Sequence, residues 1–216
     1  MNLKDIILKI NKNKLKTIFI ILFVSFIIWI LIPVSTLNKD YSTVIVDKNN
    51  KILRVFLNKD EQWYLPPDKD LKIPDKLKTS ILYFEDKYFY YHFGINPVSI
   101  FNSFFENLNK GYISRGGSTI TMQVARVINP RNRTYINKIK EIFNSIKLEL
   151  KYSKNEILNL YINNAPYGGN IVGYRAASLY YYQKSPEELT WSEACTLAVL
   201  PNSPSLISPV KIINYL

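Results

Sequence analysis

The segment EDKYFYYHFG, residues 85–94, places two acids side by side among aromatic side chains. Glu85 and Asp86 open the segment, and Phe89 is one of the aromatic residues that follow. A carboxylate in such surroundings loses solvation, which raises its pKa toward the range needed for general acid or base chemistry. We expect a helical segment that ends at Gly94. Taken alone, the segment is also compatible with a solvated acidic pair on an ordinary amphipathic helix.

The segment RGGSTITMQVAR, residues 115–126, has the composition of an anion-binding helix start. Two glycines precede Ser118, which we expect to cap a helix running through Ile128. Backbone N–H groups at such a start can meet an anion, and Arg126 adds positive charge. The alternative is a glycine turn followed by an N-cap with no ligand.

A third segment, RTYINKIKE at residues 133–141, gathers cations around one acid. Lys138 and Glu141 are three residues apart and share a helix face, with Arg133 and Lys140 close by. Such a cluster can bind a pyrophosphate or a metal-bridged phosphate. The alternative is surface pairing between residues i and i+3, worth only about 0.2–0.5 kcal/mol.

Helices are expected to dominate after a small β element. Residues 43–57 predict a hairpin, and residues 63–76, with three prolines, predict an extended linker. From Thr79 onward the pattern is helical. Capping boxes open two helices, at Ser153–Glu156 and Thr190–Glu193. Between residues 134 and 152 a helical stripe predicts one inward-packed face, formed by apolar residues 136, 139, 143, 146 and 150.

The N-terminal region predicts a membrane anchor. Residues 17–37 form an uncharged stretch of 21 residues, and about 20 are needed to cross the hydrocarbon core. Residues 1–16 carry five lysines and one acid, which predicts a cytoplasmic N-terminus with the rest of the chain outside. The alternative is a cleaved signal peptide, but the apolar core is long for one and no A-x-A pattern follows.

Composition narrows the remaining classes of protein. The chain has 216 residues and a formal charge of +11, which attracts polyanions, anionic lipids or phosphorylated substrates. We expect no nucleic-acid partner, because the anchor places the basic region outside the cytoplasm. With Cys195 as the one cysteine and His92 as the one histidine, disulfides and multi-histidine or Cys-rich metal sites are excluded. We expect Cys195 to be buried and inert.

Together, these segments resemble glycosyltransferase family 51, the peptidoglycan polymerases. EDKYFYYHFG is similar to the first family motif, E-D-x-x-F-x-x-H-x-G. GGSTITMQ, residues 116–123, is similar to the second, G-G-S-T-I-T-Q-Q, with Met122 in place of a Gln. NKIKE is similar to the third, R-K-x-x-E, with Asn137 in place of the Arg. Residues 156–169 and 173–205 match the later motifs, and the chain is most like the transglycosylase domain of class A penicillin-binding proteins of the 1C type.

The resemblance implies a mainly α, lysozyme-like fold acting on lipid II and nascent glycan strands. Glu85 would take the proton from the acceptor hydroxyl, and Glu141 would be the second essential carboxylate, assisting departure of the pyrophosphate. A divalent ion, Mg²⁺ or Mn²⁺, is compatible with Glu141, and no other cofactor is implied. The expected substrate-binding residues are Asp86, Phe89, Ser118, Gln123, Arg126, Arg133, Lys138 and Lys140.

The predicted organisation has four parts. Residues 1–16 form a cytoplasmic basic tail, 17–37 a transmembrane helix, 38–78 the hairpin and linker, and 79–216 the glycosyltransferase domain. The expected location is the bacterial cytoplasmic membrane, with the catalytic domain on its outer face and other cell-wall synthesis proteins as partners. The transpeptidase domain of bifunctional relatives is missing, so we expect a monofunctional polymerase or a piece of a longer protein.

Two other functions remain open. A peptidoglycan-cleaving hydrolase of similar fold would also use paired carboxylates, but it has no pyrophosphate for the basic cluster to hold. A non-catalytic membrane-bound scaffold would keep the fold without needing both acids. Met122 and Asn137 depart from the family motifs and leave room for the scaffold.

Overall fold

The computed structural model describes residues 12–33, 37, 40–49, 52–67, 72–112, 116–132 and 134–202. The chain divides into two compact units, Met1–Ser35 and Thr36–Leu216. Helix α2, Lys12–Leu31, lies in the first unit and exposes most of its apolar side chains. Among the described residues, however, no helix meets the combined length and apolarity required to cross a membrane. The transmembrane helix at residues 17–37 therefore stays a prediction.

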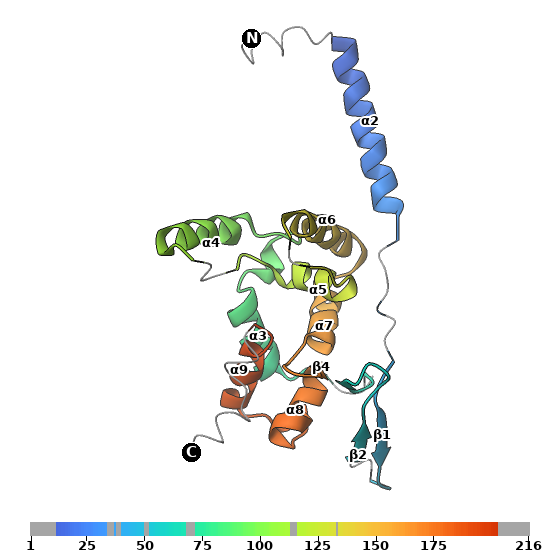
Figure 1. Cartoon of the computed structure of the whole chain (residues 1–216), viewed down its shortest axis with the longest axis vertical. Helices are drawn as coiled ribbons and strands as arrows, with labels where there is room; N and C mark the ends of the chain where they lie inside the picture. Colours follow the sequence, from blue (N-terminus) through green and yellow to red (C-terminus); the bar gives the residue numbers. More distant parts are fainter. Residues whose placement is uncertain are drawn as a thin grey trace. The chain divides into compact units, whose positions relative to one another are not determined.

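The second unit is mainly helical, which confirms the mainly α part of the predicted fold class (Figure 1). Within the described part of this unit, three short strands precede the helices and a fourth lies among them. The elements follow in the order β1 (Thr43–Val46), β2 (Ile52–Phe56), β3 (Trp63–Tyr64), α3 (Asp75–Glu85), η1 (Phe89–Tyr91), α4 (Pro97–Lys110), α5 (Ile120–Ile128), α6 (Tyr135–Lys151), α7 (Lys154–Asn164), β4 (Ile171–Val172), α8 (Tyr174–Tyr182), η2 (Pro186–Glu188) and α9 (Trp191–Val199).

The predicted hairpin is present. Strands β1, Thr43–Val46, and β2, Ile52–Phe56, pair antiparallel with Val44 opposite Val55. The Asn49 N–H donates to the Asp47 carboxylate at 2.8 Å, as expected for a turn stabilised by a short polar side chain.

The predicted linker contains a strand that the sequence pattern did not predict. Strand β3, Trp63–Tyr64, pairs in parallel with β4, which lies more than a hundred residues later in the chain. The Tyr64 hydroxyl also donates to Asn164 Oδ1 at 2.5 Å. These contacts attach the segment after the hairpin to the helical body, and the first helix after it, α3, begins at Asp75 rather than Thr79.

Helix starts were predicted with mixed success. Both capping boxes, Ser153–Glu156 and Thr190–Glu193, are confirmed, with reciprocal side-chain and backbone hydrogen bonds. The predicted cap at Ser118 is wrong by one residue. Thr119 is the N-cap of α5, and its hydroxyl accepts from the Met122 N–H at 3.2 Å.

The predicted inward stripe of α6 is wrong. Ile136, Ile139, Phe143 and Leu150 are all exposed. The buried positions of the helix are instead Ser145, Lys147 and Leu148. Periodicity identifies an apolar face but not the surroundings of that face. Helix α6 packs against α5, and Glu141 on its polar side pairs with Arg126 of α5. Cys195 also differs from expectation, because it is exposed.

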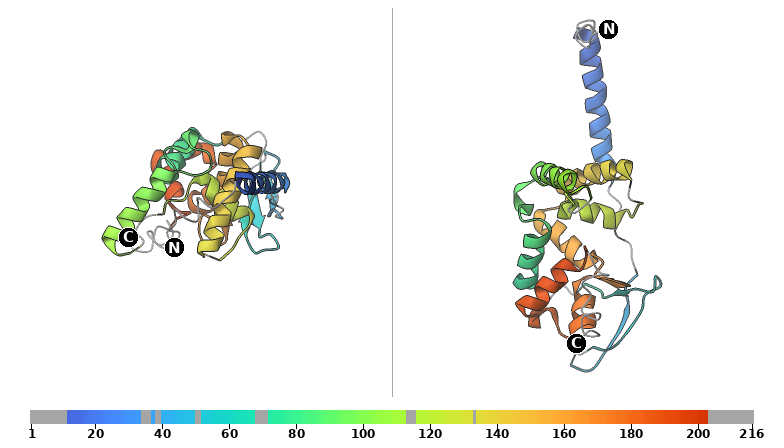
Figure 2. Two further views of the ribbon diagram at one scale, coloured as in Figure 1. Left: turned by 90° about the horizontal axis from the view of Figure 1, so that it is seen from above. Right: turned by 60° about the vertical axis from the view of Figure 1, so that its left-hand side comes forward.

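Packing inside the second unit brings three helix pairs together. Helix α5 packs against both α6 and α7, and α3 packs against α9 (Figure 2). Helices α4 and α6 lie at one end of the unit, and the hairpin lies at the other (Figures 1 and 2). The site residues are therefore carried by α3, α5 and α6, whose relative positions are fixed by this core.

Candidate active site

Glu85 is the last residue of α3, and Asp86 is the C-cap. The 85–94 segment is therefore not one helix, as predicted, but a helix end followed by a turn and the short helix η1. A side chain at a helix end has fewer neighbours from its own helix than one in the middle. This position leaves Glu85 half-buried, between the protein interior and solvent.

Both oxygens of the Glu85 carboxylate accept hydrogen bonds from amides. Gln123 Nε2 donates to Oε2 at 2.6 Å, and Asn202 Nδ2 donates to Oε1 at 2.8 Å. Burial raises the pKa of Glu85, while the hydrogen bonds from Gln123, Asn202 and Tyr161 oppose the rise. The direction of the pKa shift is the one expected from the aromatic surroundings, and it suits a general base.

Asp86 and Phe89 support this segment from the inside. The Asp86 carboxylate contacts His92 Nε2 at 2.9 and 3.0 Å and accepts from the Ile120 N–H at 3.1 Å. It therefore joins the end of α3 to the start of α5. Phe89 is fully buried, with the Lys154 ammonium 4.5 Å from its ring centre. Neither side chain is accessible, so a direct contact with substrate stays a prediction, whereas a positioning role follows from these contacts.

Gly94 explains why the first segment ends as it does. Its φ of +75° lies in the left-handed region, and an added Cβ would be 3.0 Å from the Ser145 backbone of α6. Its carbonyl accepts from the Thr119 hydroxyl at 2.6 Å. The loop after η1 is thus held against both α5 and α6.

Glu141 lies between two cations. Arg126 Nε is 3.0 Å from Oε1, and Lys138 Nζ is 3.1 Å from Oε2. Lys138 Nζ also donates to Ser118 Oγ at 2.5 Å. The predicted cluster of Ser118, Arg126, Lys138 and Glu141 is therefore brought together, with partly exposed charges on both cations.

Helix α5 connects the two carboxylates. Gln123, which binds Glu85, and Arg126, which pairs with Glu141, are three residues apart and therefore share a helix face. A helix rises about 1.5 Å per residue, so these two positions are separated by roughly one turn. Two acids 56 positions apart in the sequence thus contact neighbouring residues of one helix face.

Other predicted residues are not joined to this cluster. Lys140 is exposed on α6 and Arg133 lies outside the described residues. Sequence reasoning missed Asn202, which contacts Glu85 from 117 residues away, and Tyr161, whose hydroxyl donates to Gln123 Oε1 at 3.5 Å. No spacing signal connects Asn202 to Glu85, since their contact depends on the packing of α3 against α9.

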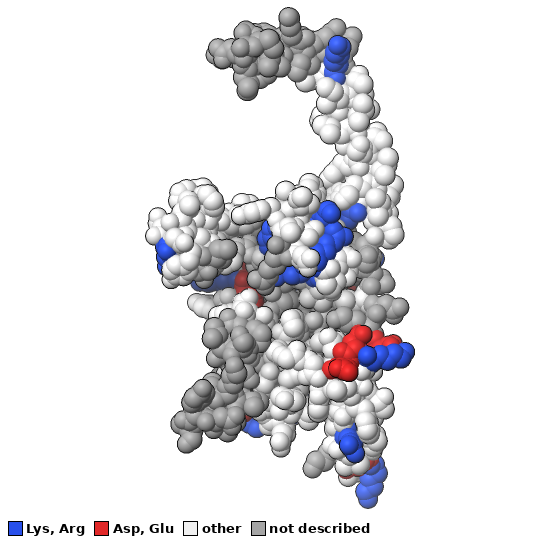
Figure 3. All heavy atoms as spheres, viewed as in Figure 1, with Lys and Arg blue, Asp and Glu red and all other residues white. Residues whose placement is uncertain are grey.

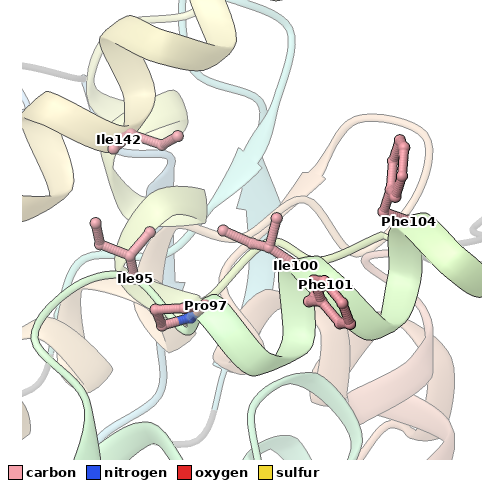
Figure 4. A pocket seen from close by; sticks show the side chains of 6 residues that line it. All are labelled: Ile95, Pro97, Ile100, Phe101, Phe104 and Ile142. Atoms are coloured by element: carbon pink, nitrogen blue, oxygen red, sulfur yellow. The ribbon is translucent and has the colours of Figure 1, made fainter.

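An apolar hollow of about 390 Å³ lies between α4 and α6 (Figure 4). One of its walls is Ile142, the residue after Glu141, and Figure 4 shows Ile95 and Ile100 on the α4 side. The full lining is Ile95, Pro97, Ile100, Phe101, Phe104 and Ile142. An apolar hollow beside a charged cluster suits a ligand that has both a hydrocarbon part and an anionic part.

The surface is divided in the same way into a charged region and an uncharged region. On the face seen in Figure 3, Lys and Arg gather over the region of α5 and α6, and the neighbouring surface of α4 is mainly uncharged. Among the described residues, no group of three or more His, Cys, Asp or Glu is placed to hold a metal ion. Both Glu141 oxygens face cations, and a divalent ion at this carboxylate stays a prediction.

A mainly helical body in which carboxylates from two other helices, α3 and α6, contact one face of α5 is compatible with a glycosyltransferase domain. Comparison with known proteins agrees. The profile of the transglycosylase family matches residues 49–215. Penicillin-binding protein 1C of Escherichia coli (strain K12) is 42% identical over 166 residues, which are 77% of this chain and 21% of that protein.

Two proteins of Bacillus subtilis (strain 168) are also similar. Penicillin-binding protein 1F is 34% identical over 170 residues, 78% of this chain and 23% of that protein. Penicillin-binding protein 1A/1B is 36% identical over 179 residues, 82% of this chain and 19% of that protein. The chain spans about a fifth of the length of these curated relatives. The chain belongs to the transglycosylase family, the peptidoglycan glycosyltransferases predicted from its motifs.

Proposed function

We propose that this chain polymerises lipid II into glycan strands, with Glu85 as general base. The observation that carries the proposal is the contact of Glu85 and Glu141 with neighbouring residues on one face of α5. A base and a cation-bound acid at this spacing can act at the two ends of one reacting sugar. The mainly helical body is consistent with the lysozyme-like arrangement that the family resemblance implies.

In the proposed reaction, the acceptor hydroxyl attacks the anomeric carbon of the donor. Glu85 takes the hydroxyl proton as the new glycosidic bond forms, and the bond from the anomeric carbon to the pyrophosphate breaks. The raised pKa of Glu85 brings the proton affinity of its carboxylate closer to that which a general base needs near neutral pH. The base is also held by Gln123, which limits its rotamers.

The leaving group acquires negative charge as it departs. Arg126 and Lys138 are the cations that would hold it, and Glu141 keeps both in place between substrate turnovers. Preorganised cations stabilise developing charge without having to move during the reaction. This gives Glu141 a positioning role, while Ser118 orients Lys138. A requirement for Mg²⁺ or Mn²⁺ stays a prediction, and the proposed reaction is described without a metal ion.

A membrane location fits the exposed apolar surface. Helix α4 exposes Phe101, Phe105 and Leu108, and α6 exposes Ile136 and Ile139 at the same end of the unit. An exposed apolar surface of this kind is typical of a protein or membrane contact. Combined with the uncharged 17–37 stretch and the lysines before it, this supports a single-pass anchor with the catalytic unit on the outer face.

The decisive experiment is an assay of the purified chain with labelled lipid II. We expect long glycan strands, and no release of sugars from finished peptidoglycan. Glu85→Gln should abolish polymerisation and leave lipid II binding largely intact, because the amide keeps the shape but cannot take a proton. Full activity in that variant would show that Glu85 is not the base. Strand formation by the wild type would also exclude a purely scaffolding function.

A further inference from the structure

Two side-chain amides hold the two oxygens of the Glu85 carboxylate, one amide on each oxygen. Gln123 reaches Oε2 from α5 at 2.6 Å, and Asn202 reaches Oε1 at 2.8 Å from the turn that follows α9. Both distances are short, as is typical of hydrogen bonds to a charged acceptor. The side chain of Glu85 is thus fixed from two directions by elements far apart in the sequence.

The position of Asn202 is set by the fold. Its backbone N–H donates to the Val199 carbonyl at 3.2 Å, which closes the turn at the end of α9. Helix α9 packs against α3, the helix that ends in Glu85 (Figure 2). The distance from Asn202 to Glu85 therefore depends on the packing of these two helices, not on a flexible side chain alone.

An amide is a suitable donor for a catalytic carboxylate. Its N–H favours the charged form of the acid, and it does not compete for the proton that the base must accept. Each carboxylate oxygen has two lone-pair directions. Gln123, Asn202 and the Tyr161 hydroxyl supply three donors to these four directions, which leaves one direction for an incoming hydroxyl.

We propose that Asn202 is a positioning residue for Glu85, and that Asn202 and Gln123 form a two-amide clamp that orients the carboxylate and keeps it ionised for proton transfer. This inference rests on the proposed function of Glu85 as a base. It adds the turn after α9 to the active site, and it predicts that the proton affinity of Glu85 depends on a residue that does not touch the substrate.

Three other titratable groups near Glu85 do not hydrogen-bond to Asn202 among the contacts described: Asp86, Tyr161 and Tyr167. Asp86 raises the pKa of Glu85 and is itself held by His92. Tyr161 and Tyr167 are buried, and burial raises the pKa of each phenol far above neutral, so both remain uncharged. A change in the titration of Glu85 on substitution of Asn202 would therefore report the lost hydrogen bond.

The test is a carbon-detected NMR titration of the Glu85 carboxyl in the full chain, assigned with Glu85→Gln. In Asn202→Ala the midpoint should rise by about 0.5–1 pH unit, because a donor to the charged form is lost. In the isosteric Asn202→Asp it should rise further, since a second negative charge faces Glu85. Asn49→Ala, which removes a carboxamide from the hairpin turn, should leave the midpoint unchanged.

The polymerisation assay gives a second readout. The acid limb of the kcat profile should move upward in pH by the same amount in Asn202→Ala, with KM for lipid II unchanged. Equal midpoints in wild type and Asn202→Ala would overturn the clamp. A wild type that does not polymerise lipid II would instead refute the proposed function, and the NMR titration, which needs no substrate, would still decide the clamp.

Discussion

At the scale of single residues, the protonation of Glu85 determines when the proposed base can work. A base must be ionised before it accepts a proton, so activity is present above its pKa and is lost as pH falls through it. Burial raises the pKa of Glu85 above the ordinary value of 4.5. We therefore expect the acid limb of kcat to have its midpoint above pH 4.5. A profile of polymerisation rate against pH would measure it, and a midpoint at or below 4.5 would contradict this assignment.

Two lysines of α6 allow a matched test of the cations that are proposed to hold the leaving group. Lys138 contacts both Glu141 and Ser118, whereas Lys140 is exposed on the same helix. Lys138→Ala should lower kcat by about a hundredfold or more, since a preorganised donor at developing charge is worth roughly 2.7–4 kcal/mol in known sites. Lys140→Ala should change kcat by less than about twofold.

Steady-state polymerisation by both variants, at one ionic strength, would separate the two roles. Equal losses would mean that Lys140 also holds the leaving group, as the cluster of cations in residues 133–141 predicts. From spacing along the helix, both lysines were predicted to lie near Glu141. Spacing puts Lys138 and Glu141, three residues apart, on one helix face. It does not predict the rotation of α6 about its axis, which brings Glu141 to Arg126 of α5.

At the scale of elements, the start of α5 depends on a close approach to α4. A Cβ added to Gly117 would lie 2.8 Å from the Cα of Ile100, and backbone cannot move aside as a side-chain end can. A Cβ on Gly116 would meet nothing within 4 Å. Gly117→Ala should therefore destabilise the fold by about 1–3 kcal/mol, as overpacking does, while Gly116→Ala should not.

Thermal unfolding of the two variants would test this expectation. Ser118 follows Gly117 directly, so Gly117→Ala should also reduce polymerisation by displacing the partner of Lys138. If both alanine variants unfolded at the wild-type temperature, α4 and α5 would not be in the close contact described here.

Local signals predicted the elements better than their surroundings. The capping boxes at Ser153 and Thr190 were correct because a box depends on four consecutive residues alone. The pairing of β3 with β4 was missed, because a two-residue strand carries no periodicity. The 85–94 segment looked like one helix, yet Asp86 ends α3 because its carboxylate binds His92 and the start of α5.

At the scale of the whole molecule, the residues of the candidate site could be named from the sequence, but their geometry could not be predicted. The motifs supplied Glu85, Gln123, Arg126 and Glu141, and the packing of α5 between its neighbours brought them together. Asn202 was out of reach, since nothing local marks its contact with Glu85. The exposed face of α6 was assigned inward because a soluble core is the usual reason for an apolar stripe.

The exposed apolar side chains of α4, at the same end of the unit as α6, lead to a prediction about the membrane. Leu108 on α4 is 60% exposed and does not line the hollow, and Leu53 on β2 is 64% exposed. If α4 contacts a bilayer, Leu108→Glu should slow polymerisation of vesicle-embedded lipid II by about tenfold, because burying a leucine side chain is worth roughly 1.5–3 kcal/mol. Leu53→Glu should leave that rate unchanged, and neither variant should alter thermal unfolding.

The difference in rate between the two variants should shrink when lipid II is supplied in detergent micelles. Equal rates in vesicles would show that α4 does not contact the membrane.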